Sequence, residues 1–158
     1  EITDATGLLL GSGEAPVEMP PGKSRRVLRV DCRECLRERG DRDVLVWLTY
    51  TGGDTVDAEN LVMFRYPKCM HLPDPGLEWS VTAKAHADGQ YVIGIRSTRP
   101  AFWVRLGLRD TDCHFSDNFF CLRPGSECTI EASPEQRLSL DAFMEQLEVS
   151  SLVDLYDS

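Results

Sequence analysis

The clearest signal along the chain is an alternation of apolar and polar residues, which predicts β-strands. In residues 79–87, Trp79 and Val81 fall on one face and their polar neighbours fall on the other. Asp88-Gly89 follows, a strong signal for a two-residue hairpin turn, and a second alternating run begins at Tyr91. Because Trp79 shares the phase of Val81, we expect Trp79 to lie in the core.

Three more strands are predicted after this hairpin. The apolar face of the first consists of Phe102, Val104, Leu106 and Leu108. The other two cover residues 119–122 and 128–132, with Pro124-Gly125 between them. Short strands separated by turn residues, without intervening helices, predict an all-β fold of the β-sandwich type.

The last segment changes from strand to helix periodicity. The apolar residues at helical spacing are Leu140, Phe143, Met144 and Leu147. They predict a helix of roughly ten residues that ends near Val149 and packs on a sheet. Ser139 or Asp141 is placed to cap the start of this helix. The apolar tail that follows, from Leu152 to Tyr156, is expected to dock on the same domain.

The first part of the chain carries a weaker pattern. Strand-like runs lie at 27–30, 44–51 and 61–66, and prolines near 67–78 indicate a junction. We therefore predict two regions, residues 1–72 and residues 76–158. Three or four strands cannot close a sandwich, which needs about seven. The first region is thus expected to be part of a second sandwich, completed by a neighbour or by strands upstream of residue 1.

Charge and hydropathy then exclude several classes of protein. The formal net charge of −9 argues against a nucleic-acid-binding scaffold, which needs a basic face. The longest apolar run has five residues, too few to span a bilayer. Residues 127–158 carry eight acidic groups and one basic group, interleaved with the apolar stripe of the predicted helix. We interpret these charged residues as the solvated side of that helix. At the other end of the chain, we expect the first residue to be a cut end and not a natural start.

Two segments near the C-terminus resemble a known family. Residues 115–125 read FSDNFFCLRPG, and residues 138–156 read LSLDAFMEQLEVSSLVDLY. They are similar to the C-terminal immunoglobulin-like domain of family 2 β-mannosidases, which carries a phrase of the form R-F-S-D-N-x-F-D-L-L-P-G-E and an S-L-x-D-x-Y tail. This chain departs from the phrase at His114, Cys121 and Ser126. Residues 57–75 also look like the family's linker between its last two sandwiches.

The resemblance sharpens the expected architecture. It implies an immunoglobulin-like β-sandwich with a short C-terminal helix (76–158), preceded by part of the penultimate sandwich (1–72). Enzymes of that family hold their catalytic Glu pair on a (β/α)₈ barrel, and a barrel needs about 250 residues, more than this chain has. No catalytic residue, cofactor or metal is therefore assigned to this chain.

The carboxylates do not form a convincing catalytic or cation site in the sequence. Asp110 and Asp112 are two residues apart, but they are expected to be solvated turn residues. Together with Asp117 and Asn118 they contain oxygen ligands suited to Ca²⁺, yet the spacing is not that of an EF-hand loop. We expect Asp117-Asn118 to hold a local turn through hydrogen bonds to nearby backbone amides.

The cysteines and histidines are also weak candidates. Cys32-Arg33-Glu34-Cys35 has the spacing of half a zinc site, but no second CxxC or HxxxH accompanies it, and no βαβ pattern indicates a thioredoxin-like role. We interpret the two as ordinary thiols beside a solvated connector. The three histidines are scattered, no GxSxG elbow is present, and Gly11-Ser12-Gly13 is not a nucleotide-binding loop. Disulfide pairing cannot be read from the six cysteines.

One aromatic residue merits a carbohydrate test. Trp103 is out of phase with Phe102 and Val104, so it faces away from the core of its strand. The simplest interpretation is that Trp103 covers an interdomain contact or the helix. The alternative is that its ring stacks on a sugar, and Trp103 is the one carbohydrate-binding residue that the sequence proposes.

These observations lead to one preferred function and one rival. The preferred function is structural support within a family 2 glycoside hydrolase most like β-mannosidase, an enzyme that removes terminal β-linked mannose. The expected partners are the remainder of that enzyme and, through open strand edges, a second copy of this chain. The rival is an independent carbohydrate-binding or adhesion module, and an unrelated secreted enzyme is a third alternative. The compartment is left open among periplasmic, secreted and lysosomal.

Overall fold

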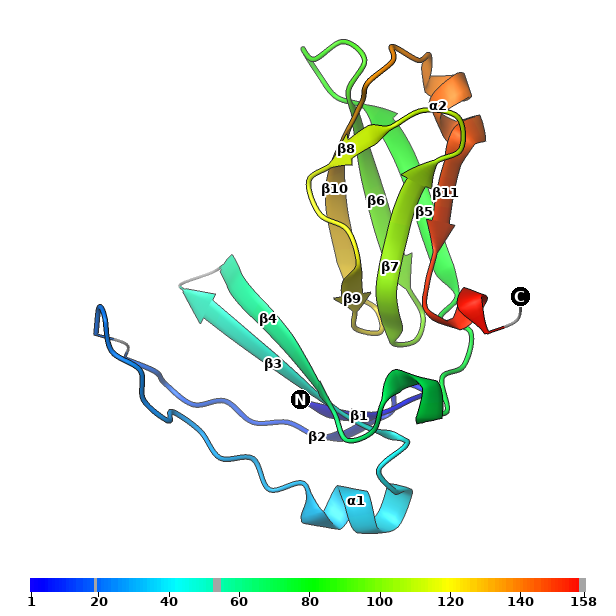
Figure 1. The fold of residues 1–158 in the computed structure, drawn as a ribbon. Helices are drawn as coiled ribbons and strands as arrows, with labels where there is room; N and C mark the ends of the chain where they lie inside the picture. The colour runs from blue at the N-terminus through cyan, green and yellow to red at the C-terminus, as the bar shows by residue number, and fades with distance from the viewer. Residues whose placement is uncertain (19, 53–54, 157–158) are drawn as a thin grey trace. The chain divides into compact units, whose positions relative to one another are not determined.

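The chain is divided into two compact units. The computed structural model describes residues 1–18, 20–52 and 55–156. Unit 1 comprises Glu1–His71 and unit 2 comprises Leu72–Ser158 (Figure 1). That unit 1 is part of a second sandwich stays a prediction.

Unit 1 is built on one antiparallel sheet with the strand order β2-β1-β3-β4. Its strands are β1 (Ile2–Asp4), β2 (Leu9–Gly11), β3 (Val44–Gly52) and β4 (Thr55–Met63). The unit also contains helix α1 (Arg33–Arg39) and the 3₁₀ helix η1 (Pro67–Cys69). In the described part of unit 1, no second sheet faces these four strands. The sequence pattern did not indicate β1 and β2, which are only three residues long.

The strand predicted at residues 27–30 is wrong. Val27, Leu28 and Val30 are exposed and belong to no strand. A strand needs a partner for its backbone groups, and in the part of unit 1 that the structure describes no neighbouring strand pairs with this run. Its apolar character therefore does not lead to a strand.

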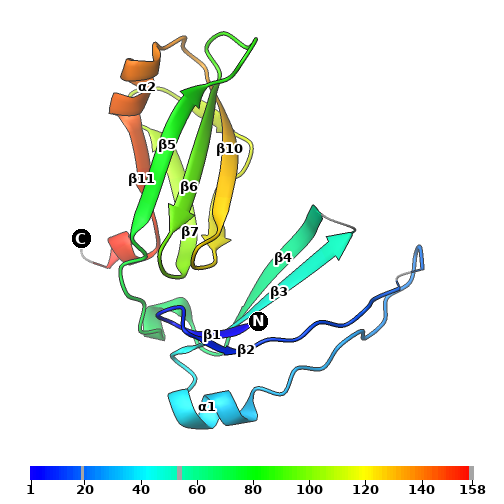
Figure 2. The same ribbon diagram turned by 180° about the vertical axis from the view of Figure 1, so that it is seen from behind.

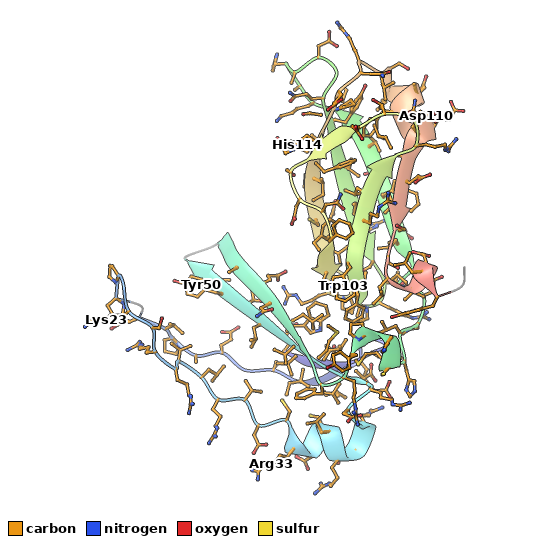
Figure 3. All side chains as sticks on the ribbon, in the orientation of Figure 1. Lys23, Arg33, Tyr50, Trp103, Asp110 and His114 are labelled. Carbon is orange, nitrogen blue, oxygen red and sulfur yellow. The ribbon has the colours of Figure 1, made fainter. Side chains whose placement is uncertain are left out.

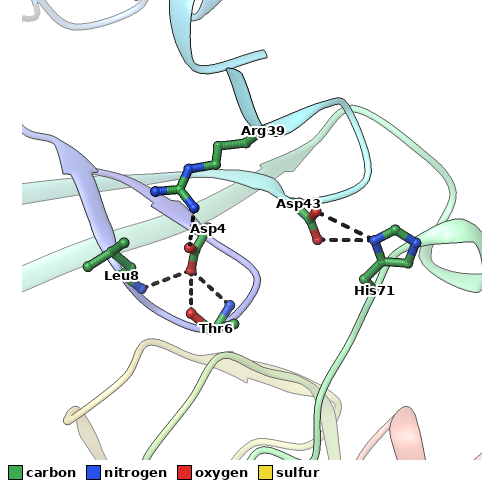
Figure 4. Close-up of polar contacts among 6 residues, drawn as sticks. All are labelled: Asp4, Thr6, Leu8, Arg39, Asp43 and His71. Carbon is green, nitrogen blue, oxygen red and sulfur yellow. Dashed lines mark hydrogen bonds and ion pairs between the residues drawn. The ribbon is translucent and has the colours of Figure 1, made fainter. Parts of the chain in front are cut away.

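Asp4 organises the turn that joins β1 to β2. Its carboxylate Oδ1 accepts hydrogen bonds from the Thr6 hydroxyl at 2.7 Å, the Thr6 amide at 2.9 Å and the Leu8 amide at 3.0 Å (Figure 4). Arg39 at the end of α1 approaches the other oxygen at 3.7 Å. Burial raises the pKa of Asp4, but these hydrogen bonds and the Arg39 charge outweigh it and hold the pKa below 3.8. The turn is thus stabilised by an ionised carboxylate.

Unit 2 is a sandwich of two antiparallel sheets. One sheet has the order β5-β6-β10-β8 and the other has the order β11-β7-β9. Figure 1 views the sandwich from the side of β7 and β11, and Figure 2 views it from the side of β5, β6 and β10. The strands are β5 (Leu77–Ala83), β6 (Tyr91–Ser97), β7 (Ala101–Leu108), β8 (Cys113–Phe115), β9 (Phe120–Leu122), β10 (Glu127–Pro134) and β11 (Leu147–Ser150). The predicted pairing of β5 with β6 is confirmed, but the two-residue turn is wrong, because β5 ends at Ala83 and residues 84–90 form a longer connection that contains Asp88-Gly89.

The core of unit 2 lies between the two sheets and is closed by helix α2 (Leu140–Gln146). The core residues are Tyr91, Ile93, Ile95, Ala101, Val104, Leu106, Leu122, Ile130, Ala132, Phe143 and Leu147. Phe143 is fully buried and stacks on Tyr91, with ring centroids 4.1 Å apart. Ser139 caps α2, because its hydroxyl accepts a hydrogen bond from the Ala142 amide at 3.2 Å. An all-β sandwich with a short terminal helix is therefore confirmed.

Three expectations about these elements are wrong, one about where the helix ends and two about which side chains are buried. The helix ends at Gln146 instead of near Val149, because residues 147–150 pair with β7 as strand β11. Met144 is 52% exposed and is not part of the packed stripe. Trp79 keeps the phase of Val81 but is 48% exposed, because β5 is an edge strand. An edge strand has a neighbouring strand on one side only, so a side chain there can stay exposed even when its position in the apolar–polar alternation predicts burial.

The C-terminal tail docks only in part. Leu152 is buried, and its amide donates a hydrogen bond to the Phe102 carbonyl at 2.9 Å. The following 3₁₀ helix η2 (Val153–Leu155) and Tyr156 leave two apolar side chains, Leu155 and Tyr156, exposed. None of the helices among the described residues is long and apolar enough to cross a membrane.

Replacement of Phe143 tests how much the sandwich depends on α2. Phe143→Ala is expected to lower the free energy of unfolding by about 3–5 kcal/mol, because it leaves a cavity between the sheets. Met144→Ala is the matched control on the same helix, and it should change that free energy by less than about 0.5 kcal/mol because Met144 is exposed. Urea denaturation of both variants measures the difference. Equal effects would contradict the described core.

Replacement of Asp4 tests the charged turn of unit 1. Asp4→Asn keeps an acceptor oxygen but removes the charge, and it should cost about 1–3 kcal/mol at neutral pH. Because the pKa of folded Asp4 lies below 3.8, this stabilisation is present above pH 3.8 and is lost as the pH falls through the folded pKa. The stability gap between native chain and variant should therefore shrink in acid. Asp41→Asn is the control, since Asp41 pairs with Arg65 on an exposed surface.

Candidate functional site

A bulge in β7 determines where Trp103 points. Ala101 pairs with Leu122 and Val104 pairs with Phe120, so two residues of β7 oppose the single residue Cys121 of β9. The extra residue shifts the alternation, and both Ala101 and Val104 lie in the core. Trp103 has a backbone φ of +49°, in the left-handed region, and its side chain is 43% exposed. The prediction that Trp103 faces away from the core is thus confirmed.

Phe119 is a second exposed aromatic residue with a left-handed backbone. Its φ is +60° and its side chain is 62% exposed. Its amide donates a hydrogen bond to the carbonyl of Val104, the residue after Trp103, at 2.8 Å. Trp103 and Phe119 therefore come from adjacent positions of β7 and the turn before β9. We call these two residues the aromatic pair.

Asn118 holds the turn that carries Phe119. Its side chain accepts a hydrogen bond from the Leu106 amide at 2.9 Å and donates one to the Leu106 carbonyl at 3.0 Å. Asp117 accepts a hydrogen bond from the Asn118 amide at 2.8 Å. The local role predicted for Asp117-Asn118 is confirmed. The Asn118 side chain thus pairs with the backbone of β7 as a neighbouring strand would. These two hydrogen bonds tie the turn that carries Phe119 to the strand that carries Trp103.

The backbone at the aromatic pair is strained, and the surrounding bonds maintain the strain. A left-handed conformation costs a non-glycine residue about 1–2 kcal/mol. Such strain persists where neighbouring structure determines the backbone, and it clusters at binding surfaces. An exposed indole offers a flat apolar face and one N–H donor. The aromatic pair therefore presents apolar ring faces and one N–H donor at the surface.

Burial limits the chemistry of the cysteine beside Trp103. Burial raises the pKa of the Cys121 thiol, and a hydrogen bond from the Trp103 backbone amide offsets this only in part. Cys121 is consequently a neutral thiol at physiological pH and not a nucleophile. Cys121 occupies the position of the second Asp in the family phrase, so that carboxylate is missing here.

The other candidate residues of unit 2 are not assembled into a site. Asp110 and His114 lie at the end of the sandwich opposite to Trp103 (Figure 3). Asp112 lies in the turn before β8, where its backbone carbonyl accepts a hydrogen bond from the Glu135 amide at 2.9 Å. Within residues 1–18, 20–52 and 55–156, no three His, Cys, Asp or Glu side chains come together to hold a metal ion.

Sequence reasoning found Trp103 but missed Phe119. The pattern of residues 119–122 indicated a strand, and Phe119 was taken as its first residue. The strand starts at Phe120, one residue later, and Phe119 belongs to the turn. Neither apolar periodicity nor residue type signals a positive φ at a phenylalanine, because only the bonds to Val104 and Asn118 create it.

The fold and the site together define an immunoglobulin-like β-sandwich with a surface aromatic pair and a helix-closed core. The family model of the mannosidase Ig-fold domain matches residues 72–155, which is more than half of the chain. The chain belongs to this family of Ig-fold domains. The family match therefore extends the resemblance seen in residues 115–125 and 138–156 to residues 72–155.

A solved structure shares the fold of nearly the whole chain. It is the crystal structure of β-D-mannosidase from Dictyoglomus thermophilum, with a TM-score of 0.73 and 19% sequence identity. The likeness covers 96% of this chain and 18% of that chain. A search of curated proteins found no match. This chain is thus an immunoglobulin-like domain related to β-mannosidase and spans less than a fifth of the length of the enzyme that it matches.

Proposed function

We propose that this chain is a non-catalytic β-sandwich region of a glycoside hydrolase resembling β-mannosidase, and that it supports the structure of that enzyme. The observation that carries the proposal is the family match over residues 72–155, joined to a likeness that spans 96% of this chain but 18% of a β-D-mannosidase. The parent enzyme would remove terminal β-linked mannose. Its remaining domains would be the partner of this region.

Unit 1 offers the surface for that partner. The sheet of unit 1 carries a stripe of exposed apolar residues on one face, formed by Leu48 and Tyr50 of β3 and Val62 of β4. Val46, Leu48 and Tyr50 are alternate residues of β3, so their side chains point to the same side of the sheet. Val46 pairs directly with Val62, so Val62 points to that side as well. In the described part of unit 1, no second sheet covers this face. We propose that the rest of the enzyme covers the stripe.

Two measurements on the 158-residue chain test this proposal. The chain should hydrolyse no p-nitrophenyl-β-mannoside, and light scattering should show self-association at high concentration, because the stripe and the sheet edges are open. Tyr50→Glu should reduce the self-association, whereas Met144→Glu, an exposed apolar residue of unit 2, should not. Measurable turnover would overturn the non-catalytic assignment. A clean monomer would contradict the role of the stripe.

A second candidate function is carbohydrate binding by the aromatic pair. The observation in its favour is the strained, exposed position of Trp103 beside Phe119. In that case this chain would act as a carbohydrate-binding or adhesion module. The two functions are compatible with the same fold, and they differ in whether the isolated chain binds sugar.

Titration with mannooligosaccharides separates the two functions. If the aromatic pair binds sugar, Trp103→Ala should abolish binding and Trp79→Ala, which removes an equally exposed tryptophan from edge strand β5, should leave it intact. Thermal unfolding of both variants checks that they remain folded. Absence of binding by the unmodified chain, or equal loss in the two variants, would rule out the aromatic pair as a sugar platform.

A further inference from the structure

Helix α1 begins at the Cys-x-x-Cys motif. Cys32 is the N-cap of α1, and its carbonyl accepts the first helical hydrogen bond, from the Leu36 amide at 2.9 Å. The segment expected to be a solvated connector is therefore a helical turn. Residues three apart on a helix lie on the same face, so the fold places the Cys32 and Cys35 side chains next to each other.

A disulfide bond between the two cysteines requires a small backbone adjustment. Residues three apart on a helix have Cβ atoms about 5–6 Å apart, and a disulfide needs about 3.5–4.5 Å. Cys32 supplies the adjustment, because as the N-cap it has non-helical angles (φ −101°, ψ 6°) that the helix does not fix. Both residues are half-buried and remain accessible to small molecules.

The surrounding charges do not activate the Cys32 thiol. Asp31 and Arg33 neutralise each other through bonds of 2.5 to 3.1 Å. Burial first, then the neighbouring Cys35 and Asp31 charges, raises the pKa of the Cys32 thiol. Cys32 is thus a neutral thiol at physiological pH, and its reaction with disulfides should accelerate as the pH rises.

None of the other four cysteines shares a helical turn with a second cysteine. Every other pair of neighbouring cysteines along the chain is at least seven residues apart. In unit 2, burial raises the pKa of Cys113 to about 11 and raises that of Cys121. These two thiols lie on separate strands, β8 and β9, which belong to different sheets. The Cys32–Cys35 pair is therefore distinguished by its geometry within a single helical turn.

We propose that Cys32 and Cys35 form a redox modification site that closes to an intramolecular disulfide on reaction with a small-molecule disulfide. One cysteine thiolate attacks the small disulfide, forms a mixed disulfide and releases one thiolate. The second cysteine thiolate then attacks the cysteine sulfur of the mixed disulfide and releases the other. Two protein thiols are oxidised, one small disulfide is reduced to two thiols, and the two cysteine protons pass to the released thiolates.

Oxidation should stabilise the first turn of α1. The helix has seven residues and no buried side chain, and so short a helix is marginal by itself. The bridge would join the N-cap to the third helical residue, across Arg33 and Glu34. The amide that reports this turn is that of Leu36, which bonds to the Cys32 carbonyl. Its hydrogen exchange should slow after oxidation.

Peptide mapping tests the proposal on the full 158-residue chain with oxidised glutathione as the probe. Trypsin cleaves after Arg29, Arg33 and Arg37, so it separates the two cysteines into peptides 30–33 and 34–37. Mass spectrometry should find these peptides joined until a reductant is added. The chain should lose two of its six titratable thiols without retaining glutathione on Cys32 or Cys35.

Two variants make the result specific. Cys32→Ser should keep glutathione on Cys35, because the second cysteine is absent and the mixed disulfide persists. Cys69→Ser, which removes a half-buried thiol from η1 in the same unit, should form the joined peptides as the native chain does. The proposal is overturned if peptides 30–33 and 34–37 stay separate, if the native chain retains glutathione on both cysteines, or if either peptide is joined to another cysteine.

Discussion

The stacking of Phe143 against Tyr91 attaches the terminal segment of unit 2 to the core between the two sheets. The two rings lie 4.1 Å apart at an interplanar angle of 23°, and the Tyr91 hydroxyl donates a hydrogen bond to the Leu138 carbonyl at 2.6 Å. These contacts fix the start of α2 to β6 in one sheet. The strand that follows α2 pairs with β7 in the other sheet. The terminal segment therefore connects both sheets, and the sandwich is incomplete without it.

The same scaffold makes the aromatic pair possible. The Asn118 side chain forms hydrogen bonds with the amide and the carbonyl of Leu106. The Phe119 amide donates a hydrogen bond to the carbonyl of Val104, two residues earlier in β7. Because Val104 and Leu106 are anchored in the core, the strained backbone of Trp103 and Phe119 cannot relax without disturbing it. Surface geometry here is a consequence of core packing.

Sequence patterns predicted the buried strands better than the edges. Ile93 and Ile95 of β6 and Ile130 of β10 are almost fully buried, as alternation indicated, because these central strands are covered by the opposite sheet. Trp79 and the run at 27–30 have comparable apolar character but are exposed. Periodicity predicts on which face of a sheet a residue lies, but it does not predict whether another element packs on that face. The elements that bury a side chain come from distant parts of the chain.

The amino-acid sequence was enough to predict the all-β fold and a capped terminal helix, with Ser139 or Asp141 as the cap, because strand alternation, turn residues and helix caps are local patterns. Tertiary structure alone decided the bulge at Trp103, the end of α2 at Gln146 and the pairing that turns the following residues into β11. The physical reason is that backbone hydrogen bonds between strands join residues far apart in sequence. A local pattern specifies which side chains prefer burial, but only the partner strand specifies register, bulges and helix ends.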